Sequence, residues 1–375
     1  MRKILFFIES LEGGGAEKVL CNLVNAMDQT RFDITVQTLW KTDAARFLKP
    51  GIRYRYCYAA KNRFNSFRSR LEAADGLTYP LHIKGHYDIE VAYLEFGSTK
   101  IMAASTNRKA LKLAWVHCDL MKKLSDPAAF VEKAGDWYRS FDRVICVSQT
   151  ARHSFVSLFG MEDKTAVLYN TVNDAEIREK SLQAGTLPLE KRRFTVLSVG
   201  RLSEEKQFGR LLSVHRRLLE AGLPHDLWIL GEGDQRPVLE VYIAENGLSD
   251  SVRLPGFCSN PYPYMAQADL LVCSSRYEGF STFITEGLIL GRPIVTTDCS
   301  GMQELLGDSQ YGLITENSEE GLYKGLKDLL ANPERLGDYA LAAKARGSAF
   351  STGTLVKKTE SFLEDSLRAR ASEQE

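Results

Sequence analysis

The segment from Glu278 to Glu286 reads Glu-Gly-Phe-Ser-Thr-Phe-Ile-Thr-Glu and carries residue types suited to binding chemistry. Its two carboxylates are eight residues apart, and an amphipathic helix is expected to begin at Ser281. The free N–H groups of a helix start attract an anion, and a carboxylate accepts hydrogen bonds from the vicinal hydroxyls of a sugar. The segment therefore predicts a site that binds both a phosphate and a polyol.

Two cations, Arg201 and Lys206, follow a strand-like apolar run. A departing nucleoside diphosphate accumulates negative charge, and two fixed cations can stabilise that charge without a metal. The alternative is a solvated helix start, in which Glu204 and Glu205 pair with both cations. The carboxylate segment favours the binding role, because it follows another strand of the same expected sheet, where ligands of such sheets bind. Together the two segments indicate a sugar-nucleotide site.

Glycine clusters follow two of the expected strands. In the first, Gly14 and Gly15 would let a ligand approach the backbone at a helix start. Lys18 breaks the Gly-x-Gly-x-x-Gly dinucleotide fingerprint, which argues against a nicotinamide-dependent oxidoreductase. A ligand loop and a plain strand-to-helix turn both remain open for this cluster. The second cluster, Gly231-Glu-Gly233, is expected to be a turn.

The carboxylate pair also invites comparison with glycoside hydrolases. Eight residues across a loop and a helix do not establish the spatial separation that acid and base catalysis requires. Glu286, near the first turns of the helix, is suited to a ribose. A structural role also stays open for Glu278, since an acidic side chain near a helix start interacts favourably with its dipole.

Length and composition limit the class of protein. A chain of 375 residues fits two domains of moderate size. Its 48 basic and 48 acidic residues give no net charge, so no global field favours a nucleic acid, and no nucleic-acid partner is expected. The seven cysteines form no Cys-x-x-Cys pair, which indicates a reduced cytoplasmic setting and no cysteine metal site.

Short apolar runs alternate with longer amphipathic segments in both halves of the chain. This rhythm predicts α/β domains in which crossover helices join the strands of a parallel sheet. The expected strands cover residues 4–8, 34–39, 89–94, 110–116 and 143–147 in the first half, and 194–200, 227–230, 270–273 and 293–297 in the second.

Loss of apolar periodicity over residues 171–193 predicts an interdomain linker. We therefore expect an N-terminal domain over 1–170 and a C-terminal domain over 194–351, with a central cleft between the two parallel sheets. The closing segment, 352–375, has a helical pattern and is expected to cross back onto the first domain.

The order and spacing of several motifs resemble those of the family 4 retaining glycosyltransferases, over nearly the whole chain. The resemblance implies a GT-B fold, with two Rossmann-like domains, an acceptor domain followed by a nucleotide-sugar donor domain. The motifs are Gly14-Gly-Ala-Glu17, Trp115-Val-His117, Val147-Ser148, Gly200-Arg-Leu-Ser-Glu-Glu-Lys206, Gly231-Glu-Gly233, Glu278-Gly-Phe280 through Glu286, and Gly291-Arg-Pro-Ile-Val295 with Gly301 and Glu304.

The resemblance implies a role for each matching residue. Arg201 and Lys206 would bind the donor diphosphate, Glu286 the ribose and Glu278 the transferred sugar. Backbone groups would help to hold phosphate at Phe280, Ser281 and Thr282.

In the first domain the resemblance points to Gly14 and Gly15, which would approach the phosphate or sugar. It also points to His117, which matches an active-site histidine that follows a strand. The alternative for His117 is a polar residue whose hydrogen bonds are satisfied near the core.

The implied reaction transfers a sugar, typically from a UDP-sugar, to an acceptor hydroxyl with retention of anomeric configuration. The departing phosphate would help to deprotonate the acceptor on the same face. The chain contains no Asp-x-Asp sequence, so a metal-held pyrophosphate is not expected and no metal or other cofactor is required. Ser281, Thr282 and Gly287 depart from the residues common in the family, which leaves the choice of sugar open.

Two basic stretches bear on the acceptor. Residues 61–70 interleave cations with Phe64 and Phe67, a composition suited to an anionic lipid surface. A second stretch, within 100–123, surrounds His117. The alternative is an ordinary solvated surface. If they bind lipid, the acceptor is a polyprenyl-linked glycan of capsule, lipopolysaccharide or other surface-polysaccharide assembly, and the enzyme is peripheral at the cytoplasmic face of the inner membrane.

Two other functions stay open. A sugar-nucleotide epimerase of the same fold would need acid and base carboxylates in the first domain, and none is identifiable from the motifs. A non-catalytic sugar-nucleotide-binding protein would keep the donor site without turnover.

Overall fold

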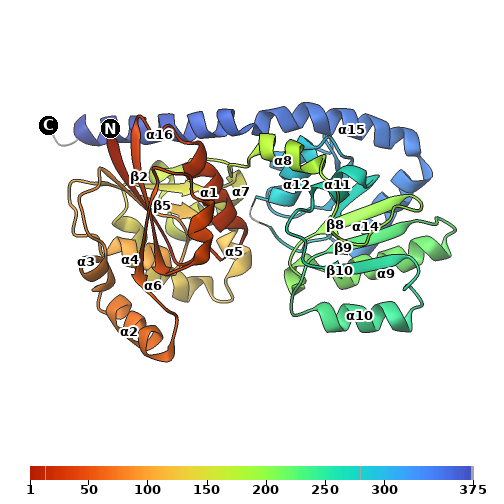
Figure 1. Cartoon of the computed structure of the whole chain (residues 1–375), viewed down its shortest axis with the longest axis horizontal. Coiled ribbons are helices and arrows are strands. Elements are labelled where there is room, and N and C mark those ends of the chain that lie inside the picture. Colours follow the sequence, from red (N-terminus) through yellow and green to blue (C-terminus); the bar gives the residue numbers. More distant parts are fainter. Residues whose placement is uncertain (13, 279, 373–375) are drawn as a thin grey trace. The chain divides into compact units, whose positions relative to one another are not determined.

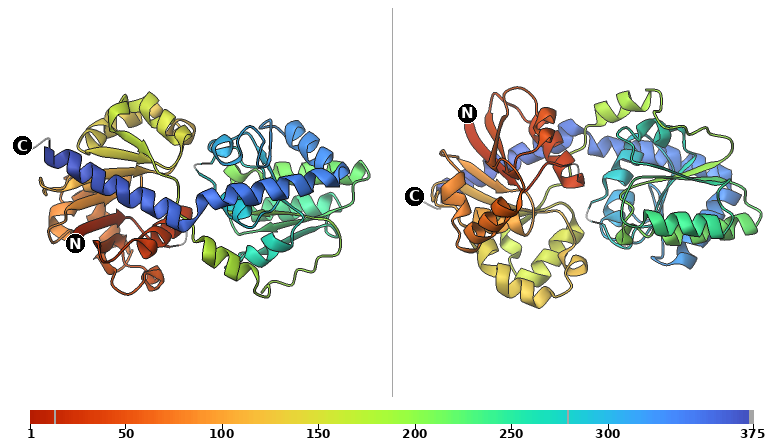
Figure 2. Two further views of the ribbon diagram at one scale, coloured as in Figure 1. Left: turned by 90° about the horizontal axis from the view of Figure 1, so that it is seen from above. Right: turned by 60° about the horizontal axis from the view of Figure 1, so that its bottom comes forward.

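The computed structural model describes residues 1–12, 14–278 and 280–372. The chain divides into two compact units, which are described separately below. Unit 1 comprises Met1–Thr171 and Thr352–Glu375, and unit 2 comprises Val172–Ser351. Each unit is built on a parallel sheet with helices at its faces, as Figures 1 and 2 show.

Seven strands within the described part of unit 1 form one parallel sheet in the order β3-β2-β1-β4-β5-β6-β7. The alternation of apolar and amphipathic segments predicted this class of fold. The alternating Arg and Tyr of β3 concealed that strand, because its side chains are mostly solvent-accessible. The strands are β1 (Arg2–Ile8), β2 (Phe32–Trp40), β3 (Arg53–Tyr58), β4 (Ile89–Ala92), β5 (Leu111–Val116), β6 (Arg143–Cys146) and β7 (Thr165–Val167).

The helices of unit 1 include α2, whose N-cap Asn62 accepts a hydrogen bond from the Asn65 N–H at 2.8 Å. The helices are α1 (Gly15–Ala26), α2 (Arg63–Ala74), α3 (Thr78–His82), α4 (Gly97–Ala103), α5 (Leu120–Lys123), α6 (Pro127–Arg139), α7 (Gln149–Phe159) and α16 (Thr352–Ser372), with 3-10 turns η1 (Asp43–Phe47) and η2 (Glu162–Lys164).

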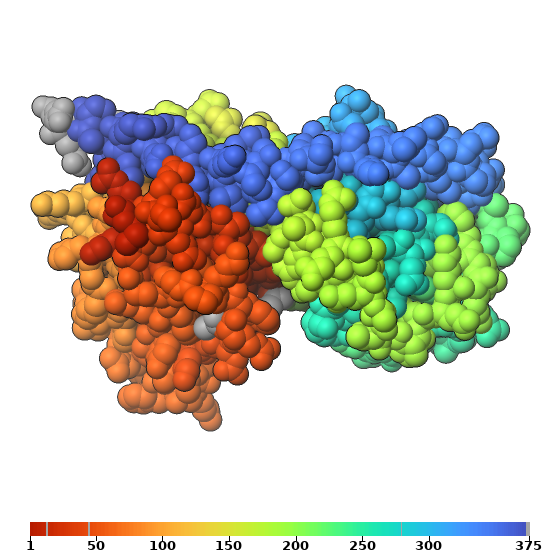
Figure 3. Space-filling view, turned by 45° about the horizontal axis from the view of Figure 1, so that its top comes forward, coloured from red at the N-terminus to blue at the C-terminus, as the bar shows by residue number. Residues whose placement is uncertain are grey.

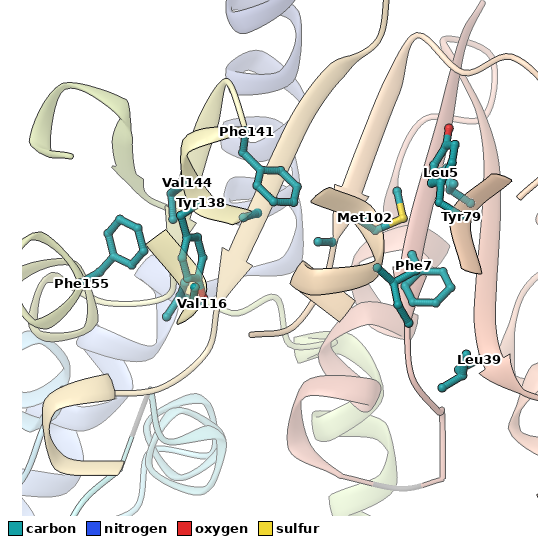
Figure 4. Packing of buried hydrophobic residues seen from close by; sticks show 14 of the residues in the cluster. Leu5, Phe7, Leu39, Tyr79, Met102, Val116, Tyr138, Phe141, Val144 and Phe155 are labelled. Atoms are coloured by element: carbon teal, nitrogen blue, oxygen red, sulfur yellow. The ribbon is translucent and has the colours of Figure 1, made fainter. Parts of the chain in front are cut away.

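The strands of the unit 1 sheet are buried by the apolar side chains that pack against the sheet. Leu5 and Phe7 of β1 are fully buried, and the rings of Tyr138 and Phe155 meet edge to face at 4.8 Å. Figure 4 shows these residues in the core between the strands and their crossover helices. Continuous apolar runs in such strands reflect burial on both faces of a parallel sheet.

The C-terminal helix α16 packs on unit 1, and Figure 3 shows its residues in the darkest blue. Glu360 on this helix accepts the backbone N–H of Asp28 at 2.7 Å and pairs with Arg31 at 2.9 Å. Near its end, Arg370 pairs with Asp142. The helix therefore returns to the first unit through both polar and apolar contacts.

Six strands within the described part of unit 2 form a second parallel sheet, in the order β10-β9-β8-β11-β12-β13. They are β8 (Thr195–Val199), β9 (Asp226–Leu230), β10 (Val252–Gly256), β11 (Leu270–Cys273), β12 (Ile294–Thr297) and β13 (Leu313–Thr315). The helices are α8 (Asp174–Ser181), α9 (Phe208–Glu220), α10 (Arg236–Glu245), α11 (Tyr262–Gln267), α12 (Thr282–Ile289), α13 (Met302–Leu306), α14 (Glu319–Ala331) and α15 (Pro333–Gly347), with 3-10 turns η3 (Glu204–Lys206) and η4 (Ser348–Phe350).

The segment 171–193, expected to be a linker, contains helix α8. Residues from Val172 onward group with unit 2, and α8 contacts α11 and α12 there. Its apolar pattern is weak because Ile177 alone among its residues is buried. Periodicity therefore gave no indication of this helix.

Two buried histidines form a hydrogen-bonded chain in unit 2. His225 Nδ1 lies 2.8 Å from the carbonyl oxygen of Leu223, so this nitrogen carries a hydrogen. His225 Nε2 is then the acceptor for His215 Nδ1 at 2.9 Å, and His215 Nε2 accepts from the Ser251 hydroxyl at 2.9 Å. This chain requires both rings to be neutral, and burial lowers the pKa of both, that of His215 to about 3.

We expect unit 2 to lose stability as the pH falls below 6.5. The unfolded chain binds protons near that pH, whereas folded His215 stays neutral until about pH 3. The buried His215 ring alone should cost about 2 kcal/mol at pH 5 relative to pH 8. Hydrogen exchange of the β8 and β9 amides at the two pH values measures this loss.

The double variant His215→Leu/His225→Leu should lose most of this pH dependence, even if it is less stable at pH 8. His153→Gln, which alters an exposed histidine of unit 1, is the control and should leave it unchanged. An equal fall in stability for the double variant and the wild type would contradict the assignment.

Candidate functional site

The predicted donor residues of unit 2 follow two adjacent strands. Arg201 and Lys206 lie after β8, and Glu278 lies after β11, its neighbour in the sheet. Because the carboxyl ends of parallel strands meet at one edge, these loops approach each other. The structure brings Lys206 Nζ to 2.6 Å from Glu278 Oε1, whereas the Arg201 side chain is exposed.

The pair between Lys206 and Glu278 is largely shielded from water, with 24% and 13% of the two side chains exposed. Ser275 Oγ donates a second hydrogen bond to Glu278 Oε1 at 2.7 Å. Burial opposes the charge on Lys206, but the attraction of Glu278 outweighs it and holds the pKa of Lys206 above its ordinary value. The site therefore contains a fixed cation and an oriented carboxylate.

This pairing bears on the alternative of a solvated helix start. The hydrogen-bonded ion pair of Lys206 is with Glu278, 72 residues away, and not with the adjacent Glu204 or Glu205. The pair holds the segment after β8 against the segment after β11. A pair between Lys206 and its neighbours in the sequence, as the alternative expects, would not join these two segments.

Backbone packing positions the loop that carries Arg201. A Cβ at Gly231 would lie 1.9 Å from the carbonyl oxygen of Gly200, and one at Gly233 would lie 2.2 Å from that of Leu202. The Leu202 N–H donates to the carbonyl of Glu232 at 2.8 Å. Gly231-Glu-Gly233 lies in the connection between β9 and α10, just before the turn at Asp234 and Gln235, and its glycines permit close contact with the Arg201 loop.

Helix α12 begins at Thr282, with Ser281 as its N-cap, as the sequence predicted. The expectation of an amphipathic helix is wrong, since Phe283 through Ile289 are all buried. The cause is its surroundings, because α8, α15 and β12 all contact it. Phe280 is also buried, and Gly279 of the same segment lies outside the described residues.

Glu286 lies on the buried helix α12 with only 6% of its surface exposed. The Tyr262 hydroxyl donates to Glu286 Oε1 at 3.0 Å and orients the carboxylate. The next residue, Gly287, leaves room for Leu271, whose Cδ1 would lie 2.6 Å from a Cβ there. This contact explains why glycine stands where the family commonly has alanine.

Arg210 on α9 helps to position the predicted donor residues, and the sequence motifs did not indicate it. Its guanidinium donates to Asn317 Oδ1 at 3.0 Å and to the carbonyl of Ser274, while Ser274 Oγ donates to the Lys206 carbonyl at 2.8 Å. Arg210 thus ties the β11 loop to that of Lys206. Arg210 lies beyond the cation motif, in an amphipathic helix, where an arginine is ordinary. Its sequence position therefore did not indicate a role at the site.

The glycine cluster of unit 1 lies at the start of α1. Gly14 is the N-cap and Gly15 the first helical residue. A Cβ at Gly14 would lie 2.1 Å from Glu17 Oε2, whereas one at Gly15 would meet nothing within 4 Å. Gly15 thus borders open space, so a ligand can approach its backbone, while Gly13 lies outside the described residues.

His117 follows β5, with its ring centroid 4.8 Å from that of Tyr93 and 6.4 Å from that of Trp115. Its Nε2 is buried and has no hydrogen-bond partner among the described residues. Burial lowers the pKa of His117 to about 4, so the ring is neutral at physiological pH. Because Nε2 has no protein partner among the described residues, the site role of His117 stays a prediction.

Buried Glu95 fixes the backbone at His117, and the motifs did not indicate it. Its carboxylate accepts the His117 N–H at 3.0 Å, the Cys118 thiol at 3.2 Å and the Lys123 ammonium at 3.3 Å. Burial opposes its ionisation, but Lys123 and the other donors hold the pKa of Glu95 below its ordinary value. Glu95 is therefore a charged anchor for the segment after β5.

Within the described residues, no group of three or more His, Cys, Asp or Glu side chains is placed to hold a metal ion. The expectation of a metal-independent reaction stays a prediction.

A double-mutant cycle on Lys206→Met and Glu278→Gln tests the ion pair. Each single change leaves a buried group without its charged partner and should destabilise unit 2 by about 2–3 kcal/mol. The double variant should be clearly more stable than the sum of the two losses predicts. Hydrogen exchange of the β8 and β11 amides gives the four free energies.

The matched control is the pair of Glu320 and Lys324 on α14, which is largely exposed in the same unit. Its cycle should give a coupling energy of no more than about 0.5 kcal/mol. The same result for Lys206 and Glu278 would show that they do not act as a buried pair.

Models of two protein families match the chain. The model "Glycosyltransferase Family 4" covers residues 13–176, and the model "Glycosyl transferases group 1" covers residues 179–346. The boundary between them falls close to that between the compact units.

Individual relatives extend over most of the chain. A Campylobacter jejuni N-acetylgalactosamine-N,N'-diacetylbacillosaminyl-diphospho-undecaprenol 4-alpha-N-acetylgalactosaminyltransferase is 29% identical over 97% of this chain and 100% of its own. The lipopolysaccharide core biosynthesis glycosyltransferase LpsE of Rhizobium meliloti is 25% identical over 85% of this chain and 86% of its own.

Among solved structures, Anabaena HepE in complex with UDP-glucose has a similar fold. Its TM-score is 0.75 at 20% identity, with 97% of this chain and 100% of HepE covered. The two Rossmann-like parallel-sheet units are thus those of a GT-B fold. With both halves matched by its models, the chain belongs to the family 4 glycosyltransferases.

Proposed function

We propose that the protein transfers a sugar, with retention of configuration, from a UDP-sugar to a hydroxyl of a polyprenyl-linked glycan in cell-surface polysaccharide biosynthesis. The observation that carries the proposal is the shielded pair of Lys206 and Glu278 at the carboxyl edge of a parallel sheet. The names of the Campylobacter and Rhizobium relatives support the lipid-linked acceptor and the surface-glycan setting. The complex of HepE with UDP-glucose supports the nucleotide.

The donor site of unit 2 would work by charge stabilisation. Arg201 and Lys206 bind the diphosphate and stabilise the charge that develops as it departs. Glu286, oriented by Tyr262, accepts hydrogen bonds from the ribose hydroxyls. Glu278 contacts the transferred sugar, and the N–H groups at the start of α12, at Phe280, Ser281 and Thr282, hold phosphate.

Retention would follow from a reaction on one face of the sugar. As the bond to the diphosphate breaks, the acceptor oxygen attacks the same anomeric carbon, and a phosphate oxygen takes the hydroxyl proton. No side-chain nucleophile and no metal take part. In unit 1, Gly14 and Gly15 approach the donor, and neutral His117 forms a hydrogen bond with substrate through Nε2, the buried atom left without a protein partner.

A thermal-shift screen of sugar nucleotides tests the donor assignment, since a ligand that binds only the folded state raises its melting temperature. UDP-sugars should stabilise the wild type, and Glu286→Ala should remove most of this shift. Arg201→Ala and Lys206→Ala should each lower kcat by about 100-fold or more, because each removes a fixed charge.

Lys324→Ala is the matched control, since it removes an exposed cation from unit 2 and should keep both binding and turnover. Stabilisation by no UDP-sugar would refute the proposed donor. Normal binding without turnover of any donor would favour the non-catalytic alternative.

Helix α2 offers a surface for the membrane that a polyprenyl acceptor requires. Phe64, Phe67 and Leu71 are 72%, 63% and 50% exposed and recur at the three- and four-residue spacing of one helix face. The exposed Arg63 and Arg70 belong to the same helix. An apolar stripe with neighbouring cations is typical of helices that lie in an anionic membrane surface.

The opposite side of α2 is fixed to unit 1 by Glu72. This buried carboxylate accepts hydrogen bonds from the Tyr58 hydroxyl and Arg68 Nε, each at 2.5 Å, and lies 2.7 Å from His82 Nε2. The stripe is therefore held toward solvent, and Figure 1 shows the helix at the end of unit 1 away from α16. Arg68 is paired with Glu72 within the helix, so Arg63 and Arg70 are the cations of α2 proposed to face lipid.

The second basic stretch is largely committed to internal contacts. Lys112 donates to the Ser105 carbonyl at 3.0 Å, Lys123 pairs with Glu95, and Lys122 lies 3.9 Å from an oxygen of Asp119. The ammonium of Lys100 lies 5.9 Å from the Trp137 ring centroid. The structure therefore favours 61–70 over 100–123 as the membrane-facing segment.

Membrane association is tested by co-sedimentation with vesicles of phosphatidylglycerol and phosphatidylcholine. The variant Arg63→Glu/Arg70→Glu should bind at least about tenfold more weakly at moderate salt, because each cation near an anionic surface contributes about 1 kcal/mol. Phe64→Ser/Phe67→Ser should also weaken binding, and this effect should persist at high salt.

The control variant Arg108→Glu/Lys109→Glu makes the same charge change at exposed positions of the second basic stretch. It should bind like the wild type. Binding that is equal in all four proteins would show that α2 is an ordinary solvated helix.

Within the described chain, no helix is both long and apolar enough to cross a membrane. We propose a peripheral enzyme at the cytoplasmic face of the inner membrane, where UDP-sugars and polyprenyl-linked acceptors are both accessible.

A further inference from the structure

The carboxyl edge of the unit 1 sheet holds a carboxylate, Glu9, that has no part in the donor site. Glu9 follows β1 directly, and its carbonyl oxygen accepts the N–H groups of Leu39 and Trp40 at 3.2 and 3.3 Å. Its side chain is half-buried and within the electrostatic range of Lys61. Backbone pairing thus fixes the residue, while its side chain keeps some exposure to solvent.

A strained turn after β4 supports this carboxylate. Phe96 has φ 67° and ψ −111°, a conformation that costs a bulky residue about 1–3 kcal/mol. The Phe130 ring, 5.3 Å away, and the Lys123 ammonium, 5.4 Å from the Phe96 ring centroid, hold it in place. Such strain persists where the surrounding structure enforces it, often at ligand sites.

The strained turn presents Gly97 to Glu9. The Gly97 N–H donates a hydrogen bond to the Glu9 carboxylate. A Cβ at Gly97 would lie 1.8 Å from Glu9 Oε1 and 2.8 Å from its Cδ, so glycine is required for this approach. The N–H of Gly97 therefore orients the Glu9 carboxylate, and the missing side chain of Gly97 leaves space for it.

The same turn also serves His117. Glu95, next to Phe96, accepts the His117 N–H, while Gly97 binds Glu9. The strands that precede these residues, β1, β4 and β5, are consecutive in the sheet. Glu9 and His117 are therefore placed by one segment at one edge of one unit, and this edge belongs to the half of the chain expected to receive the acceptor.

We propose that Glu9 is an acceptor-binding residue, whose carboxylate accepts a hydrogen bond from a hydroxyl of the acceptor sugar. This inference rests on the proposed function. Burial raises the pKa of Glu9, against the attraction of Lys61 and the Gly97 N–H, so its charge is incompletely compensated by the protein. Lys61 immediately precedes the N-cap of α2, which connects the proposed membrane helix to the sugar end of the acceptor site.

Steady-state kinetics of Glu9→Gln test the assignment. The probes are the UDP-sugar that stabilises the wild type and a lipid extract of the native host, titrated as acceptor. The neutral amide still accepts the Gly97 N–H but binds a hydroxyl more weakly, so the apparent acceptor KM should rise about tenfold or more. The donor-induced thermal shift and the slow hydrolysis of donor without acceptor should not change.

Gly97→Ala offers an independent test, because its methyl group displaces the Glu9 carboxylate. It should raise the same KM and leave the donor shift intact. Two controls should match the wild type: Glu12→Gln, an exposed carboxylate of the same loop, and Gly353→Ala, where a Cβ meets nothing within 4 Å.

An acceptor KM of Glu9→Gln within twofold of the wild-type value would overturn the proposal. The proposal would also be wrong if Glu9→Gln lost both the donor-induced thermal shift and turnover. Both results leave the proposed function intact. Absence of any donor shift in the wild type would instead refute the proposed function itself.

Discussion

The pairing of Lys206 with Glu278 organises the donor half of this molecule. The two residues come from loops that follow different strands, and their contact excludes most of the surrounding water. A cation in such a place is stable only while its partner is ionised, so neither loop can move far without exposing an uncompensated charge. Arg210 strengthens this constraint, because it joins the β11 loop to β13 and α14 through Asn317. The result is an ion pair fixed at the carboxyl edge of the unit 2 sheet.

Unit 1 uses the same principle with different residues. Glu95 is a buried anion that is bonded to a backbone N–H, a thiol and an ammonium, and these bonds determine the course of the chain after β5. The strained conformation of Phe96 follows from this anchoring, since Glu95 and Gly97 bind in different directions on either side of it. In both units, then, a carboxylate at the carboxyl edge of the sheet binds a lysine that follows the neighbouring strand.

Much of the fold and of the donor site could be predicted from the sequence, because both depend on patterns that lie within short stretches of the chain. Continuous apolar runs predicted the buried strands, and the cation and carboxylate motifs predicted residues that the structure joins. Local patterns could not predict β3, whose tyrosines and arginines alternate at a solvated edge, or α8, which buries little besides Ile177. Glu9, Glu95 and Arg210 were also missed, since their importance arises from contacts with residues distant in sequence. The burial of α12 on all sides depends on its contacts with α8, α15, β12 and η4 and is likewise a tertiary property.

The anchoring of α2 by Glu72 has a thermodynamic consequence for any encounter with lipid. Many membrane-active segments are disordered in water and must fold as they bind, so part of their binding energy is lost to chain ordering. Here the helix is already capped by Asn62 and held by the contacts of Glu72 with Tyr58 and His82. Its backbone therefore has little ordering entropy left to lose, so under the proposed membrane role a small apolar stripe would be sufficient for weak attachment. An enzyme held in this way would leave one acceptor and reach the next without unfolding any part of its surface.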